Sequence, residues 1–227
     1  MPSILFVFTS VDKHLKGGQT GWYLPEAAHP YYVLAPHFQI DFAAPNGPNP
    51  PVDEGSVKNF SGDKESVDFL NDEAVKTKLK TAKILSEVDH KNYDAVFYVG
   101  GHGPVIDLPT DPVNIKLASD FYNSGKITSA VCHGPAALVG ATTTDGKSIF
   151  AGKRVAGFSN TEEEQNGSVD HVPFLLEDRI VALGGNYLKA DAWQPKVVVD
   201  GHLITGQNPA SARPLAEELL KVFNKSK

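Results

Sequence analysis

The stretch that decides the fold lies at residues 127–138 and reads ITSAVCHGPAAL. Its first half is an apolar run of the kind that forms a buried strand of a parallel sheet. Gly134 and Pro135 then favour a sharp turn and the start of a helix, because proline is preorganised for the first helical position. Cys132 and His133 lie in the turn itself. A strand, a tight turn with a reactive side chain and a helix form the layout of a nucleophile elbow, whose side chain projects above the sheet.

Three more apolar runs of the same kind precede this stretch, at residues 3–10, 38–45 and 94–101. Before residue 127 a segment shows helical spacing, with Val113, Leu117, Phe121 and Tyr122 recurring ahead of a stop at Gly125. Strand followed by helix, repeated, predicts an α/β fold with a mostly parallel central sheet flanked by helices. Ligands bind such sheets at the carboxyl ends of the strands, so the residues that close each apolar run are the candidates for function.

The C-terminal part adds a hairpin and a final helix. Asp200-Gly201, between β-branched runs at 196–205, predicts a two-residue turn. Ser211 can cap the helix that follows, whose apolar stripe consists of Leu215, Leu219, Val222 and Phe223. Two regions, at about 11–36 and 45–92, do not fit the bare sheet pattern, and segments of this length are usually lids or added subdomains. We expect one domain over residues 1–227 that carries both regions as insertions.

The composition narrows the class of protein. The chain has 227 residues, with 21 Lys and Arg against 27 Asp and Glu, and a net charge of −6. Its lysines are scattered singly, which argues against a nucleic-acid partner, since phosphate binding needs clustered cations. The apolar start at 4–8 is too short for a signal peptide, and no stretch approaches the roughly 20 apolar residues of a membrane span. The single cysteine excludes an intrachain disulfide and a multi-cysteine zinc site. We therefore expect a cytoplasmic protein, with the nucleus as a second location, that binds neither nucleic acid nor membranes.

Cys132 is the candidate nucleophile. Helix N-terminal amides close to the turn would favour its thiolate, which is the reactive form. His133 can serve it as a base only if the strand has ended, because consecutive strand side chains point to opposite faces. The alternative interpretations are an inert buried thiol and a packing histidine.

A glycine-rich turn, Gly100-Gly101-His102-Gly103, closes the run at 94–101. Glycines let backbone amides approach a ligand closely, so this turn can supply oxyanion donors; a tight turn without a function is the alternative. No G-x-G-x-x-G follows the first apolar run, which argues against a dinucleotide cofactor.

These motifs carry a resemblance to a known family. The Gly-Gly-His-Gly turn, the segment AVCHGP at 130–135 and Glu26 within GWYLPEAAHP at 21–30 resemble the ThiJ/PfpI superfamily. The chain is most similar to its branch of glutathione-independent glyoxalase III enzymes, also described as the heat-shock protein thirty-one class of chaperones. The resemblance covers essentially the whole chain. It implies a flavodoxin-like sandwich, usually dimeric, that converts methylglyoxal to D-lactate without glutathione.

The resemblance also implies the roles of individual residues. Cys132 matches the nucleophile, His133 the adjacent base, and Glu26 the carboxyl group that lies against the thiol. The acidic run at 162–164 matches the place where this branch supplies an acid to the histidine, and we favour Glu164. Gly101 matches the oxyanion donor, together with the backbone N–H of His133.

No cofactor or metal is expected. The oxidation at one substrate carbon matches the reduction at its neighbour, so no redox cofactor is required. The metal-binding cluster of some bacterial chaperone members has no match here, and eight scattered histidines give no independent support for zinc.

The partners implied are a small 2-oxoaldehyde, a second copy of the chain and unfolded client proteins. Three alternative functions remain open: a holdase chaperone, an oxidation sensor based on Cys132, and a cysteine peptidase or amidohydrolase. A peptidase needs an open groove. The aromatic residues of the first added region suggest instead a small covered pocket, and the alternative is that they are core or dimer contacts. These residues are Trp22, Tyr23, Tyr31 and Tyr32.

Overall fold

A seven-stranded sheet forms the centre of the computed structural model, which describes residues 1–225. The strand order is β3-β2-β1-β4-β5-β9-β8. Every neighbouring pair is parallel except β8 and β9, which form the predicted antiparallel hairpin. The strands are β1 (Ser3–Val7), β2 (Gln39–Ala44), β3 (Lys83–Ile84), β4 (Ala95–Tyr98), β5 (Ile127–Val131), β8 (Val197–Asp200) and β9 (Leu203–Gly206). The prediction of a mostly parallel sheet is confirmed, and β3 is an edge strand that the apolar runs did not indicate.

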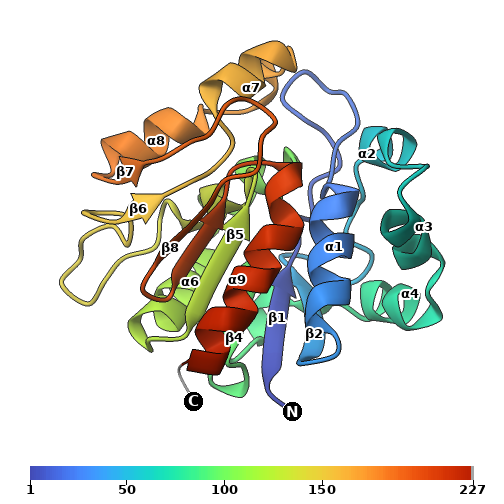
Figure 1. Cartoon of the computed structure of the whole chain (residues 1–227), viewed down its shortest axis with the longest axis horizontal. Coiled ribbons are helices and arrows are strands. Elements are labelled where there is room, and N and C mark those ends of the chain that lie inside the picture. Colours follow the sequence, from blue (N-terminus) through green and yellow to red (C-terminus); the bar gives the residue numbers. More distant parts are fainter. Residues whose placement is uncertain (226–227) are drawn as a thin grey trace.

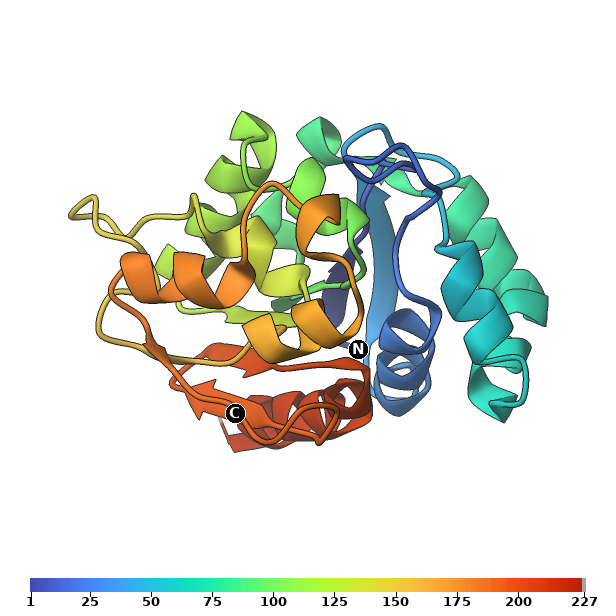
Figure 2. The same cartoon turned by 90° about the horizontal axis from the view of Figure 1, so that it is seen from above.

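Helices cover both faces of this sheet (Figures 1 and 2). Two long helices, α1 (Leu24–Leu34) and α9 (Ala212–Lys225), lie side by side on one face, and α6 (Pro112–Asn123) covers the other. Because both faces are covered, β1 from Ile4 onward and the whole of β4 are continuously apolar rather than alternating. Ile4 to Val7 of β1 and all of β4 are fully buried.

Three short helices pack beside α1 and β2, on the right of Figure 1: α2 (Glu54–Asn59), α3 (Lys64–Asn71) and α4 (Glu73–Lys80). They form most of the region expected at 45–92 as an addition. The region expected at 11–36 is an addition only in its first part, because its second part is α1, the crossover helix between β1 and β2. Aromatic residues and Pro30 obscure the helical pattern of α1 in the sequence.

A third group of elements lies over the carboxyl ends of β5 and β9 (Figure 1). It consists of a small two-stranded sheet and two helices: β6 (Arg154–Val155), β7 (Asn186–Tyr187), α7 (Asn160–Gln165) and α8 (Leu176–Ala182). Short helical turns complete the chain: α5 (Gly103–Ile106), η1 (Leu85–Glu87), η2 (His90–Asn92), η3 (Gly134–Leu138), η4 (Val169–His171) and η5 (Pro209–Ser211).

Two local expectations need correction. The elbow leads into the 3-10 helix η3 and not into a longer α-helix. Ser211 directly precedes α9 as expected, but its hydroxyl accepts from the Lys196 backbone N–H and donates to Asn208, so it joins the β8 loop to η5. Within residues 1–225, none of the helices is both long and apolar enough to cross a membrane.

Candidate active site

Cys132 has the backbone of a nucleophile elbow. It directly follows β5 with φ of +60°, a left-handed conformation that is unfavourable for a residue with a Cβ. Two backbone hydrogen bonds hold it there: its N–H donates to Gly206 on β9, and its carbonyl accepts from Phe158. The side chain is 4% exposed and the thiol is free. The strand has therefore ended at Cys132, as the sequence required for His133 to reach the sulfur.

His133 links the thiol to a carboxylate. Its Nδ1 lies 3.6 Å from Cys132 Sγ, and its Nε2 lies 2.5 Å from an oxygen of Glu163. Both His133 and Glu163 are buried. Burial alone would raise the pKa of Glu163, but His133 and His102 outweigh it and hold that pKa well below its usual range. The carboxylate therefore stays ionised and keeps a proton on His133 Nε2, which leaves Nδ1 free to accept the thiol proton.

Glu163, and not the favoured Glu164, is the acid that the structure places against His133. Glu164 is exposed to solvent on α7. Glu162 is buried, but it bonds the backbone N–H and hydroxyl of Ser159 in a capping box at the start of the helix. Consecutive helix residues point about 100° apart, so only one of the three can face the histidine.

Glu26 lies on the other side of the sulfur. It is fully buried on α1, and neither of its side-chain oxygens has a conventional hydrogen-bond partner within the described residues. A Cβ at Gly100 would lie 2.1 Å from Glu26 Oε2 and 2.9 Å from Cys132 Cβ, so only glycine lets the turn approach both. Burial raises the pKa of Glu26 well above its ordinary value. This shift favours the protonated carboxyl, which can donate to sulfur.

The pKa of the Cys132 thiol is also raised, by burial and by the neighbouring Glu26. The expectation that helix amides would favour the thiolate is therefore wrong for the resting site, because desolvation outweighs them. The thiol must lose its proton to a base during the reaction. His133 Nδ1 is placed to take it.

Two backbone amides can stabilise an oxyanion. Gly101 has φ of +106°, and a Cβ there would lie 2.4 Å from the carbonyl oxygen of Gly21, so glycine is required. Neither the Gly101 N–H nor the His133 N–H donates a hydrogen bond to another described residue. Both residues line the same cavity as Cys132. The two amides match the donors expected from the sequence.

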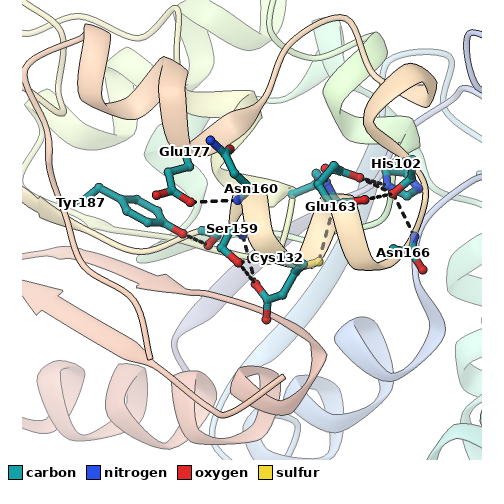
Figure 3. A network of polar contacts seen from close by, with 12 residues as sticks. His102, Cys132, Ser159, Asn160, Glu163, Asn166, Glu177 and Tyr187 are labelled. Atoms are coloured by element: carbon teal, nitrogen blue, oxygen red, sulfur yellow. Dashed lines mark hydrogen bonds and ion pairs between the residues drawn. The ribbon is translucent and has the colours of Figure 1, made fainter. Parts of the chain in front are cut away.

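His102 is a site residue that the sequence analysis missed. Its Nε2 lies 2.8 Å from Glu163 Oε1, the oxygen that also accepts from the Ser168 hydroxyl. Figure 3 shows His102 and Glu163 pointing toward one another. The available signal was its place in the Gly-Gly-His-Gly turn, directly after the oxyanion glycine. The shared carboxylate therefore orients two imidazoles.

The same three side chains could also hold a metal ion. The ligand atoms of His102, His133 and Glu163 lie within 4.8 Å of one another. Their spacing in the sequence hides this arrangement, because they come from three separate turns and helices. In the arrangement described, the carboxylate is already engaged by hydrogen bonds to both imidazoles.

The cavity above the sulfur has a volume of about 220 Å³. Its walls include Tyr23, Glu26, Asp53, Asn59, Gly101, His102, Cys132, His133, Phe158, Asn166, Trp193 and Pro209. Of the four aromatic residues considered from the sequence, only Tyr23 lines it. Trp22 and Tyr31 belong to the core, and Tyr32 packs against the core.

The fold and this site agree with a known family. The model of the DJ-1/PfpI family matches residues 25–222, and the chain therefore belongs to that family. The resemblance drawn from the sequence motifs is confirmed.

Several relatives share its full length. The chain is 32% identical to "Glyoxalase 3" of Candida albicans, across 98% of this chain and 99% of the relative. It is 31% identical to "Glutathione-independent glyoxalase HSP31" of Saccharomyces cerevisiae, across 94% of each. The solved structure of Rapid Encystment Protein 24 KDa from Francisella tularensis matches with a TM-score of 0.93 at 37% identity, across 98% of this chain and 99% of the other. The crystal structure of glyoxalase III from Candida albicans matches with a TM-score of 0.84 at 30% identity, across 97% of each.

Proposed function

We propose that this protein is a glutathione-independent glyoxalase III, which converts methylglyoxal and water to D-lactate through a hemithioacetal on Cys132. The observation that carries the proposal is the pair of groups on either side of the sulfur. His133 places its Nδ1 3.6 Å from Sγ, where it can act as a base, and burial raises the pKa of Glu26, which favours the protonated carboxyl that can act as an acid. An internal redox reaction between adjacent carbons needs one base and one acid of this kind. The names of the relatives support the same activity.

The first step forms the covalent intermediate. The thiol proton moves to His133 Nδ1 while sulfur bonds to the aldehyde carbon C1. The amides of Gly101 and His133 stabilise the alkoxide until the proton on His133 neutralises it. The product of this step is a neutral hemithioacetal, and His133 is again a base.

The second step moves the hydrogen from C1 to C2. His133 removes the C1 proton while the Glu26 carboxyl protonates the C2 carbonyl oxygen, which gives an enediol. His133 then delivers its proton to C2, and the C1 hydroxyl returns a proton to Glu26. C1 is oxidised to a thioester and C2 is reduced to a secondary alcohol, so no external oxidant or reductant is needed. Water then hydrolyses the thioester, which releases the hydroxy acid and restores the thiol.

The test is D-lactate formation from methylglyoxal with no thiol added. We expect turnover by the unaltered protein and none by Cys132→Ala, because no other residue can form the thioester. His37→Ala is the matched control and should retain full activity, because it changes an exposed histidine beyond the C-terminal end of α1, whereas Glu26 lies in the first turn of that helix. D-Lactate that fails to form, or that forms undiminished in Cys132→Ala, would contradict the proposal.

The remaining parts of the proposal rest on family membership. They are a homodimer, a cytoplasmic location extending to the nucleus, and a stress-response chaperone role toward unfolded proteins. We expect Cys132→Ala to suppress the aggregation of a heated client protein as well as the unaltered chain does, because holdase binding does not use the thiol. Absence of protection at a stoichiometric ratio would remove the chaperone role while leaving the glyoxalase proposal intact.

A further inference from the structure

Trp193 stands at the mouth of the active-site cavity in an unfavourable conformation. It is 43% exposed, and its φ of +66° places a large side chain in the left-handed region. Non-glycine residues persist there when the surroundings force them to, which happens most often at functional sites.

A buried carboxylate holds this tryptophan in place. Glu162 Oε1 accepts the backbone N–H of Trp193 at 2.9 Å and the side-chain amide of Asn208 at 2.8 Å. The other oxygen accepts from Ser159 and Gln207. Glu162 is fully buried and belongs to α7, the helix that also supplies Glu163. One helix therefore positions both the catalytic histidine and the wall at the cavity mouth.

The Trp193 ring is connected to the base by aromatic packing. It meets Phe158 edge to face at 5.7 Å between ring centroids, and Phe158 lies 4.3 Å from the His133 ring. The indole N–H donates to Gln165, which fixes the tilt of the ring. Phe158 therefore links the ring of Trp193 to the ring of His133, and the substituent on C2 of a substrate bound beside His133 lies on the side of the cavity that Trp193 lines.

A second cavity continues outward from the first. Its volume is about 540 Å³, and it shares Tyr23, Trp193 and Pro209 with the active-site cavity. Half of the other residues in its wall are apolar, namely Phe60, Ala210 and Pro214, and the other half are His29, Asn208 and Arg213. The Tyr23 and Phe60 rings meet edge to face at 5.8 Å.

The charged side chains of this second cavity already have partners. Arg213 pairs with Glu65, and His29 lies 2.8 Å from Asp63. Because these side chains are already paired, the aromatic rings of Tyr23, Phe60 and Trp193 are the part of the wall that can recognise a ligand. The surface therefore favours a neutral, flat and apolar group over an anion.

We propose that the second cavity is the subsite for the substituent on C2 of the 2-oxoaldehyde, that it takes aryl or similarly bulky apolar substituents, and that Trp193 is its specificity-determining residue. The inference rests on the proposed glyoxalase reaction. Tyr23 and Trp193 line both cavities, so a substituent that extends from the first cavity into the second passes between surfaces that these two rings form. Contact between aromatic rings then adds binding that a methyl substituent does not gain.

The test compares initial rates with phenylglyoxal and with methylglyoxal. We expect the unaltered protein to show a kcat/KM for phenylglyoxal roughly tenfold above that for methylglyoxal, as buried apolar contacts of this size provide. Trp193→Ala should lower that ratio roughly tenfold, and Trp193→Phe should restore most of it. Val181→Ala, which changes an exposed apolar residue on α8, should leave the ratio unaltered.

A second measurement follows the indole directly. In Cys132→Ala, which cannot form the thioester, the neutral amide mandelamide should shield Trp193 fluorescence from acrylamide, and lactamide at the same concentration should not. The other tryptophan, Trp22, is 1% exposed and contributes little to such quenching. Turnover of methylglyoxal with an unchanged ratio in Trp193→Ala, or equal shielding by lactamide, would overturn the subsite while the reaction stands. Absence of turnover with both aldehydes would overturn the proposed function instead, and shielding by mandelamide would still report on the subsite.

Discussion

Three consecutive glutamates of α7 have three different surroundings. Glu162 anchors the Trp193 loop, Glu163 faces His133 and His102, and Glu164 points to solvent. Each position differs from the next by the rotation of one helical step, so a choice between neighbours depends on where the helix begins. From these surroundings we infer that Glu162 positions Trp193 and that Glu163 orients His133. Glu164 does not contact the site.

This arrangement predicts different effects for two conservative substitutions. Glu163→Gln should lower kcat by roughly 100-fold or more, since the neutral amide no longer fixes the proton on His133 Nε2. Glu164→Gln should leave kcat within the error of the measurement. Steady-state rates with methylglyoxal provide the comparison. Equal losses in the two variants would show that charge on α7, and not contact with His133, is what the reaction uses.

Cys132 and His133 could be chosen as candidate nucleophile and base from the sequence because they are adjacent and lie beside two strong turn formers, Gly134 and Pro135. The helical phase of 162–164 could not be read from apolar periodicity, because residues 160–165 contain no apolar side chain. The spacing of Ser159 and Glu162 was the signal present, since a capping box fixes the helix start and would have removed Glu162 from the candidates. His102 left no signal beyond its glycine neighbours, because its partner lies 61 residues away.

At the scale of secondary-structure elements, one buried carboxyl joins β1 to α5. Asp107, at the end of α5, accepts the Thr9 hydroxyl and the Ser10 backbone N–H, both at 2.8 Å. Burial raises the pKa of Asp107 to about 6, although these hydrogen bonds oppose the shift. The contact lies at the carboxyl edge of the sheet, close to the glycine turn that precedes α5.

The raised pKa makes this contact dependent on pH in a definite direction. The folded chain binds the proton more tightly than the unfolded chain, whose carboxyl titrates near 3.8. The contribution of Asp107 to the free energy of unfolding is therefore complete below about pH 4 and is lost as pH rises through 6, a change of about 3 kcal/mol. We expect the stability difference between the unaltered chain and Asp107→Asn to change by this amount from pH 4 to pH 7.5 in urea unfolding. A difference that does not vary with pH would contradict the assignment.

The sequence predicted well those strands and helices whose residues follow one dominant hydrophobic pattern. The four long apolar runs became β1, β2, β4 and β5, because burial on both faces selects continuous apolar sequence. The sequence did not predict α1 or β3. Pro25, Pro30 and a run of aromatic residues mask the helical period of α1, and β3 has only two residues, both exposed.

At the scale of the whole molecule, acidic residues outnumber basic ones and give a net charge of −6, and the residues that line the active-site cavity show the same imbalance. Among the described residues that line it, Asp53 is acidic, the raised pKa of Glu26 favours its neutral form, and none is a lysine or arginine. Glu163 lies directly behind the lining histidines. The cavity thus offers an incoming ligand no cation.

Because a 2-oxoaldehyde carries no charge, long-range attraction contributes nothing to its capture. We expect kcat/KM for methylglyoxal to change less than about twofold between 50 and 500 mM salt, since only charged ligands are steered in this way. Initial rates of D-lactate formation, measured at several salt concentrations between 50 and 500 mM, provide the comparison. A steep fall with salt would indicate that the substrate taken up is a cation, since an acidic cavity attracts only positively charged ligands.

The cation-free lining has a further consequence for the direction of flux. In the proposed reaction a neutral aldehyde becomes a carboxylate, so hydrolysis of the thioester would place a new negative charge beside Asp53 and Glu163. Repulsion would then favour departure of the hydroxy acid. We therefore expect the accumulated product to compete poorly with the substrate for re-entry, so that the forward reaction continues while the acid builds up.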